Sequence, residues 1–190
     1  MTDGISRAHI VEAALTLLAD GGLHALGMRR IAAQLGIQQS ALYWHFDNKQ
    51  ELLGAVADDV VGGVTDPCSG AWDARVVTLA DGLRRAVLRY PDGAELVATA
   101  IAFRLGGARP TQQFVAELER AGLDAPTAEA AASVMVHFVL GFASDEQQHR
   151  QAAALGAIPH SDPASASAGD ERFARGLHLI VAGIAASRVS

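Results

Sequence analysis

The sequence has only one cysteine among its 190 residues, and this scarcity excludes several kinds of protein. Cys68 cannot form an internal disulfide, and no Cys/His cluster surrounds it, so neither a disulfide framework nor a zinc site is expected. No basic segment leads into an apolar run, and no stretch approaches the roughly eighteen uninterrupted apolar residues of a membrane span. We therefore expect a cytoplasmic protein without a membrane partner.

Catalytic motifs are missing as well. The sequence contains no Gly-rich phosphate loop, no nucleophile elbow and no His-Glu-x-x-His pattern. His137, Asp145 and His149 are four or eight residues apart and would share a helix face, where Asp145 and His149 could coordinate a metal. A metal-dependent helical enzyme is thus an alternative, but no third ligand is evident and a solvated helix end explains these residues. We expect no enzyme activity, no cofactor and no metal.

The composition is that of a helical globular protein. Half of the residues are hydrophobic, which is enough to bury a core in one large domain or in two smaller ones. No stretch reads convincingly as a strand, whereas apolar residues recur at helical spacing. The predicted fold class is all-α, with helices at about 7–21, 28–35, 39–45, 49–64, 72–89, 92–105, 111–121, 125–148 and 171–187, and a flexible loop at about 155–170.

The net charge of −6 is distributed unevenly along the chain. Residues 1–50 hold four cationic and four anionic side chains, whereas the remainder holds eleven cationic against seventeen anionic ones. A neutral segment with clustered cations can approach phosphates that the rest of the chain would repel. The distribution indicates two functional parts.

The segment "MRRIAAQLGIQQSALYWHFDNKQELL", residues 28–53, has the pattern of a nucleic-acid-binding motif. A helix, a tight turn after Gly36 and a second short helix match a helix-turn-helix, whose second helix lies in the major groove. Gln38 and Gln39 lead that helix, where an amide can donate and accept at once, as bidentate recognition of adenine requires. Lys49 lies at a helix N-terminus, where free amides and the dipole already favour an anion.

Three other side chains of this segment suit DNA. Arg29 could reach a guanine or a phosphate, and Tyr43 and His45 offer polar tips to backbone oxygens. The alternative is an ordinary amphipathic pair of helices, with Trp44 and Phe46 partly in the core. Spacing alone leaves both interpretations open.

The same segment, preceded by "IVEAALTLLADGGLHAL", resembles the DNA-binding domain of the TetR family of bacterial transcriptional repressors over about residues 5–53. More weakly, "RYPDGAELV", "ARPT", "VHFVLGFASDEQQH" and "FARGLHLIVAGI" resemble the regulatory domain of the tetracycline repressor branch. The resemblance implies a three-helix helix-turn-helix domain at 1–48 and a larger helical domain for effector binding and dimerisation at 49–190. It also implies a homodimer that binds a palindromic double-stranded DNA operator and releases it when a small-molecule effector binds.

Carried over position by position, the family's DNA contacts fall on nine residues of this chain. The base-contacting positions are Arg29, Gln38, Gln39, Ser40 and Tyr43, and the backbone-contacting positions are Ala41, Trp44, His45 and Lys49. The sequence departs from the family at Gly27, where a Thr or Ser usually caps the helix and touches phosphate. Glycine can cap a helix but offers no hydroxyl. A DNA-binding activator or a regulator without an effector is the alternative function.

Two apolar stripes near the C-terminus are candidates for the dimer interface. Two such helices from each subunit would form an intermolecular four-helix bundle, as the resemblance implies. The alternative is that both stripes close the core of the single chain. The interface residues predicted from these stripes are Met135 and Phe142 on the first and Phe173, Leu177, Ile180 and Ile184 on the second.

An effector pocket needs an apolar and aromatic lining with a few polar groups. His137 is the polar candidate within the apolar run "SVMVHFVLGF", although a core histidine bonded to a carbonyl is an alternative. The predicted lining residues are Trp72, Tyr90, Phe103, Phe114, His137 and Phe138.

The chemistry of the effector follows from two positions. Tetracycline repressors hold their drug as a magnesium chelate, and the resemblance places their histidine ligand at Val97 and their glutamate at Asp145. Magnesium needs oxygen or nitrogen donors, and valine provides neither. We therefore expect a metal-free effector that is largely apolar or aromatic.

Overall fold

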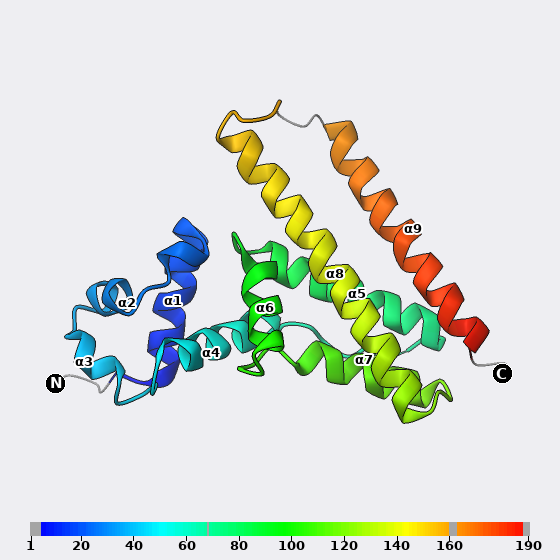
Figure 1. The fold of residues 1–190 in the computed structure, drawn as a ribbon, viewed down its shortest axis with the longest axis horizontal. Helices are drawn as coiled ribbons and strands as arrows, with labels where there is room; N and C mark the ends of the chain where they lie inside the picture. Colours follow the sequence, from blue (N-terminus) through cyan, green and yellow to red (C-terminus); the bar gives the residue numbers. More distant parts are fainter. Residues whose placement is uncertain (1–4, 68, 160–162, 188–190) are drawn as a thin grey trace. The chain divides into compact units, whose positions relative to one another are not determined.

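The structure is a computed structural model that describes residues 5–67, 69–159 and 163–187. Over these ranges the chain is helical and contains no β-strand, as the sequence predicts. The helices, shown in Figure 1, are α1 (Arg7–Gly21), the short 3-10 helix η1 (Leu23–Ala25), α2 (Met28–Leu35), α3 (Gln39–Leu42), α4 (Lys49–Gly62), α5 (Trp72–Leu88), α6 (Gly93–Ala102), α7 (Arg109–Arg120), α8 (Ala125–Ala154) and α9 (Pro163–Ser187).

The chain divides into two compact units. The first comprises residues 1–63 and 85–109, and the second comprises residues 64–84 and 110–190, so that α5 contributes to both. The boundary predicted at residue 48 lies inside the first unit. The reason is that α4 packs against α1 and α6, which keeps it with the helix-turn-helix.

The core of the first unit is built from α1, α2 and the residues around α3. Ile10 and Leu18 of α1, Ile31 of α2, and Leu42 and Phe46 are each no more than 1% exposed. The buried side chains of α1 recur at helical spacing, so the apolar periodicity of this helix is visible in the sequence. The shared core fixes α2 and α3 against α1.

In the same unit, α4 passes very close to the end of α6. A β-carbon at Gly54 would collide with the carbonyl oxygen of Leu105, so only glycine allows this approach. Asp58 of α4 accepts a hydrogen bond from the backbone N–H of Gly107 over 2.6 Å. The close approach and the hydrogen bond together hold α4 against the residues that follow α6.

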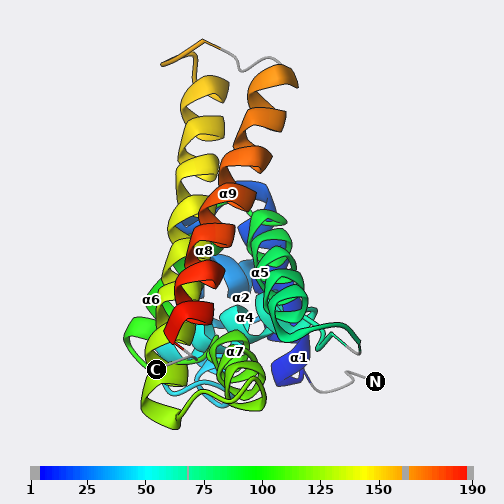
Figure 2. The same cartoon turned by 90° about the vertical axis from the view of Figure 1, so that its right-hand side faces the viewer.

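In the second unit, α8 and α9 lie side by side, as Figures 1 and 2 both show. Three aromatic rings pack between them: Phe173 of α9 lies 5.4 Å from Phe138 and 5.3 Å from Phe142, centroid to centroid. Such aromatic contacts stabilise the pair beyond the area that they bury. The two helices therefore share one apolar seam.

Arg84 of α5 ties these helices together from the side. Its guanidinium donates to the carboxylates of Glu146 on α8 and Asp170 on α9, the latter over 2.7 Å, and its carbon lies 4.7 Å from the centre of the Phe173 ring. The Arg84 and Glu146 side chains are mostly buried, which strengthens their interaction. Burial by itself lowers the pKa of Arg84, but the hydrogen bonds to both carboxylates outweigh it and leave the pKa raised.

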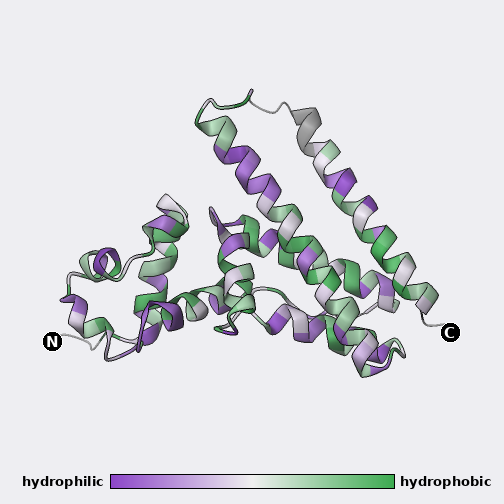
Figure 3. Cartoon of the chain, in the orientation of Figure 1, coloured by the Kyte–Doolittle hydropathy of each residue, from purple (hydrophilic) through white to green (hydrophobic). Residues whose placement is uncertain are grey.

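Helix α8 is long and apolar, with a hydrophilic band toward its C-terminal end that Figure 3 shows. By length and by a mean hydropathy of 1.3 over its most apolar window, it could cross a membrane. Met135, Val139 and Leu140 are nevertheless buried in the folded chain, as expected for the core helix of a globular unit.

The helix ends on either side of the predicted loop differ from the prediction. α8 continues to Ala154 and α9 begins at Pro163, so helices occupy part of the predicted loop at 155–170. Serine and proline suggested a loop there, but alanine favours helix and proline is tolerated at the first helical position. Cys68 lies outside the described residues.

Candidate nucleic-acid interface

The turn between α2 and α3 is set by a glycine. Gly36 adopts a left-handed conformation, with φ 67° and ψ 29°, which ends α2 without the steric cost of a β-carbon. Its N–H donates to the carbonyl of Ala33, and the N–H of Ile37 donates to the carbonyl of Ala32 over 3.0 Å. These two bonds form the Schellman arrangement and turn the chain sharply into α3.

Helix α3 is shorter than the sequence predicts. It ends at Leu42, and hydrogen bonds of the tighter three-residue type follow, such as His45 N–H to the carbonyl of Leu42 over 3.0 Å. Leu42 and Phe46 point into the core, whereas Tyr43 and Trp44 are 48% and 88% exposed. The aromatic residues that follow α3 thus divide between the core and solvent.

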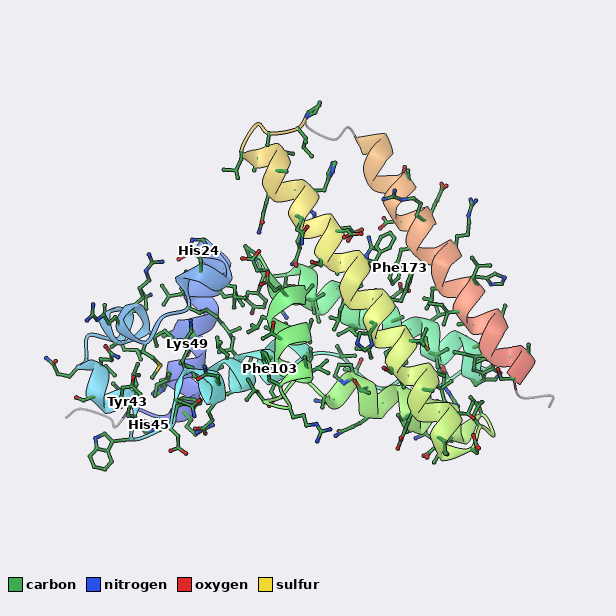
Figure 4. The ribbon with its side chains drawn as sticks, viewed as in Figure 1. His24, Tyr43, His45, Lys49, Phe103 and Phe173 are labelled. Carbon is green, nitrogen blue, oxygen red and sulfur yellow. The ribbon has the colours of Figure 1, made fainter. Side chains whose placement is uncertain are left out.

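The nine residues predicted to contact DNA all lie on α2, on α3, or between α3 and the start of α4. Figure 4 shows Tyr43 and His45 close together near the end of α3. The side-chain amide of Gln39 donates to the hydroxyl of Tyr43 over 3.3 Å. The exposed members of the set are Arg29, Gln38, Ser40, Tyr43, Trp44 and Lys49, and the half-buried ones are Gln39, Ala41 and His45.

Helix α4 begins with an ordered N-terminus. The side chain of Asn48 caps it by accepting from the backbone N–H of Glu51 over 2.9 Å, and Lys49 is the first helical residue. The N-terminus of α2 differs, because Gly27 makes no side-chain cap there. Both N-termini thus combine free backbone amides with a cationic side chain, Lys49 on α4 and Arg29 on α2, and either end can attract an anion.

Arg7 supports this surface from α1, a role that sequence reasoning did not identify. Its guanidinium donates to the carbonyl of His45 and to Oε1 of Glu51, the latter over 2.7 Å, and lies 3.9 Å from the centre of the Phe46 ring. Oε2 of Glu51 accepts from the backbone N–H of Asp47 over 2.7 Å. The Asp47 hydrogen bond and then the Arg7 hydrogen bond lower the pKa of Glu51. Because Arg7 is 38 residues from His45, no local pattern indicates the contact.

Comparison with known proteins agrees with this geometry. A family profile described as "Bacterial regulatory proteins, tetR family" matches residues 10–56, and another described as "Tetracyclin repressor-like, C-terminal domain" matches residues 65–188. The chain belongs to the TetR family.

TetR-family relatives are similar over nearly the whole chain. The class A tetracycline repressor of transposon 1721 in Escherichia coli is 32% identical over 95% of this chain and 90% of its own. Mycobacterium smegmatis BioQ is 38% identical with a TM-score of 0.86, over 96% of this chain and 98% of that one. BioQ solved with its double-stranded DNA operator is 36% identical with a TM-score of 0.81, over 96% and 99%.

A TetR-family structure with a small molecule is also similar. ActR from Streptomyces coelicolor in complex with (S)-DNPA is 29% identical with a TM-score of 0.79, over 98% of this chain and all of that one. As a TetR-family member, the chain is a DNA-binding transcriptional repressor and not an enzyme, as the sequence predicts.

The six residues predicted to line an effector pocket are divided between the two units. Tyr90 and Phe103 belong to the first unit, where Phe103 is 70% exposed, and the other four belong to the second. Phe114 is fully buried, whereas His137 is exposed and its Nδ1 lies 2.7 Å from the carbonyl oxygen of Ser133, one turn back on α8. His137 is thus not the core histidine considered as an alternative. A hollow of about 580 Å³ between α1 and α4 includes none of the six.

Four of the six residues predicted for the TetR dimer interface are buried within the single chain. Met135, Phe173, Leu177 and Ile184 are each at most 7% exposed, so they have almost no surface to give to a partner. For these four the burial favours the alternative interpretation, a stripe that closes the core. Phe142 and Ile180 are half-buried.

The two positions used to predict the effector's chemistry differ in their surroundings. Val97 is fully buried on α6, and Asp145 is exposed on α8. Among the residues that the structure describes, no group of three potential metal ligands is found.

Proposed function

We propose that this repressor binds a palindromic operator as a cytoplasmic homodimer and releases it when a small, largely apolar molecule binds to its larger helical domain. The observation that carries the proposal is the exposed polar and aromatic surface on and after α3, supported by a core of Leu42 and Phe46. A short exposed helix on a rigid base is what insertion into a major groove requires.

Within that surface the proposed roles are separable. Gln38 and Gln39 read adenine edges, because an amide donates and accepts in one plane. Arg29 contacts a guanine or a phosphate. Lys49 and the free amides at the start of α4 hold a phosphate, which fixes the position of the protein on the duplex without reading sequence.

The proposed dimer forms through the outward faces of α8 and α9. Val134 of α8 and Leu179 of α9 are 54% and 68% exposed, and Ala182 and Gly183 near Leu179 are exposed as well, so both helices present apolar residues to solvent. Small residues next to a large one permit close helix approach. The family's palindromic operators require two such subunits.

The proposed effector is metal-free and apolar or aromatic. Support comes from Val97, which offers no metal donor, and from the relative ActR, whose structure holds the organic molecule (S)-DNPA. A ligand that binds only the folded protein raises its stability, so a thermal-shift screen of small aromatic compounds can find it.

The test of the function begins with selection of duplexes from a random-sequence library by the wild-type protein. The expected result is an enriched sequence with two-fold symmetry, bound more tightly than a scrambled duplex of the same composition. A compound found by thermal shift should then release the selected duplex. Enrichment of no sequence, or of asymmetric sequences only, would overturn the proposal.

A further inference from the structure

The turn that joins the reading helix to α4 is anchored in the core by Phe46 and is also held by side chains of α1 and α4. This α3–α4 turn, residues 43–48, begins where regular helix ends, and its side chains Tyr43 and Trp44 point to solvent. The carbonyl of His45 accepts from Arg7, and the N–H of Asp47 donates to Glu51. Side chains of α1 and α4 thus hold two backbone groups of the turn.

From these contacts we infer that Arg7 is a positioning residue for operator binding: it fixes the α3–α4 turn so that the base-reading side chains keep their distance from Lys49. The inference rests on the proposed function, because it concerns the geometry in which α3 and α4 meet one DNA duplex. Residues that support a binding surface determine how closely it keeps its productive geometry.

Three contacts converge on one guanidinium. Arg7 donates to the carbonyl of His45 and to the carboxylate of Glu51, and its plane lies over the Phe46 ring. Arginine can do all three because its donors form a planar, delocalised fork that also stacks on aromatic faces. Lysine has a single ammonium and no plane, so Arg7→Lys keeps the charge and loses the arrangement.

The positive charge of Arg7 is paired with a carboxylate of the same chain. The ionised carboxylate of Glu51 neutralises it at 2.7 Å. Lys49 is exposed at the start of α4 with no such partner among the described contacts. Removing Lys49 should therefore remove a phosphate contact, whereas removing Arg7 should disturb geometry.

The Arg7–Glu51 pair should matter little for global stability. Its side chains are 50% and 38% exposed, and exposed ion pairs of this kind contribute little to folding. A loss of operator affinity in Arg7→Ala that greatly exceeds any loss of thermal stability would thus identify positioning rather than general folding support.

The experiment compares the wild type with Arg7→Ala, Arg7→Lys, Glu51→Gln and the control Arg85→Ala, an exposed arginine on α5. Each variant is titrated with the duplex selected by the wild type and with a scrambled duplex, at several salt concentrations. Arg7→Ala should weaken binding to the selected duplex about ten-fold or more, equivalent to one base contact, with the salt slope unchanged. Arg7→Lys and Glu51→Gln should give smaller losses, and Arg85→Ala none.

Hydrogen exchange provides a second measurement that does not involve DNA. Amides of residues 43–48 should exchange faster in Arg7→Ala than in the wild type, while those of α8 should be unchanged. If Arg7→Ala does not fold, the duplex titrations and the hydrogen-exchange measurement are made on Arg7→Lys and Glu51→Gln instead.

Three results would contradict the inference. Unchanged affinity for the selected duplex removes the positioning role. Equal weakening on both duplexes, with a salt slope lower by about one, makes Arg7 a direct phosphate contact. Unchanged exchange at residues 43–48 means that Arg7 does not order the turn. If the wild type selects no duplex, the proposed function itself fails, whereas the exchange comparison still decides whether Arg7 holds the turn.

Discussion

At the scale of single residues, the polar groups of the proposed reading surface are already engaged with one another. The amide of Gln39 donates to the hydroxyl of Tyr43, so both must exchange this bond for bonds to DNA. The cost of the exchange is small if DNA offers each group a partner and large if it does not. If Gln39 reads a base, as proposed, this asymmetry lets it discriminate between sequences.

The first prediction separates reading from charge neutralisation. Gln39→Ala should cost roughly 1–3 kcal/mol on the selected duplex and little on a scrambled one, because it removes a base contact. Lys49→Ala should weaken both duplexes alike and lower the salt slope by about one. Titrations at several salt concentrations distinguish the two. Equal losses on both duplexes for Gln39→Ala would remove it from the base-reading set.

The second prediction concerns acid stability. The folded protein lowers the pKa of Glu51, first through the Asp47 hydrogen bond and then through Arg7, so the contribution of this carboxylate to stability is present at neutral pH. It is lost as the pH falls below about 4.3, the ordinary pKa of glutamate, toward the lowered value. Because Glu51 is exposed, the difference in melting temperature between the wild type and Glu51→Gln should be small at pH 7 and should vanish on acidification. A gap that stays constant with pH would assign the difference to packing.

At the scale of helices, local signals in the sequence predicted beginnings and ends more reliably than partners. Ser6 caps α1, Gly36 ends α2 and Asn48 caps α4, in keeping with the preference of serine and asparagine for helix N-caps and of glycine for helix C-terminal ends. The stripe of α9 was recognised as apolar, but periodicity does not tell whether the chain itself or a second subunit covers such a face. Leu177 is buried within the single chain, and such burial depends on tertiary packing that periodicity does not carry.

The third prediction uses two neighbours on α9. Leu177 is 2% exposed and Leu179 is 68% exposed. Leu177→Glu should unfold or strongly destabilise the protein, because it buries an unpaired carboxylate. Leu179→Glu should leave the helix content intact but yield monomers in sedimentation and abolish binding to paired half-sites. A dimeric Leu179→Glu would place the interface elsewhere.

The fourth prediction concerns the arginine that joins α5, α8 and α9. Arg84→Ala should lower the free energy of unfolding by about 3 kcal/mol, because it leaves the mostly buried Glu146 with only the exposed Arg150, 3.7 Å away. The neighbouring Arg85 is exposed, and Arg85→Ala should stay within about 0.5 kcal/mol of the wild type. Denaturant titration measures both. Similar free energies of unfolding for the two variants would mean that water already solvates the Glu146 carboxylate.

At the scale of the whole molecule, the sequence predicted the fold class and the DNA-binding segment, because a long motif and local helix signals carry both. The division into compact units depends on contacts such as that of Gly54 with Leu105, about fifty residues apart, which no local pattern indicates. The sequence also did not identify Arg7 as the support of the α3–α4 turn. Long-range contacts of single polar residues leave no periodic trace in a sequence.

The chemistry of the effector is the last property argued at this scale. Tetracycline repressors are relatives of this chain, yet identity of 32% leaves room for a different ligand. Val97 offers a magnesium ion no donor, and the Asp145 carboxylate is one methylene shorter than the glutamate expected there. We therefore predict that tetracycline with magnesium neither raises the melting temperature nor releases the selected duplex. A ligand at one hundred times its Kd would stabilise the protein by about 2.7 kcal/mol, which a thermal scan detects readily. The class A tetracycline repressor serves as the positive control, and magnesium-dependent release of the duplex from this chain would show that other residues supply the missing ligands.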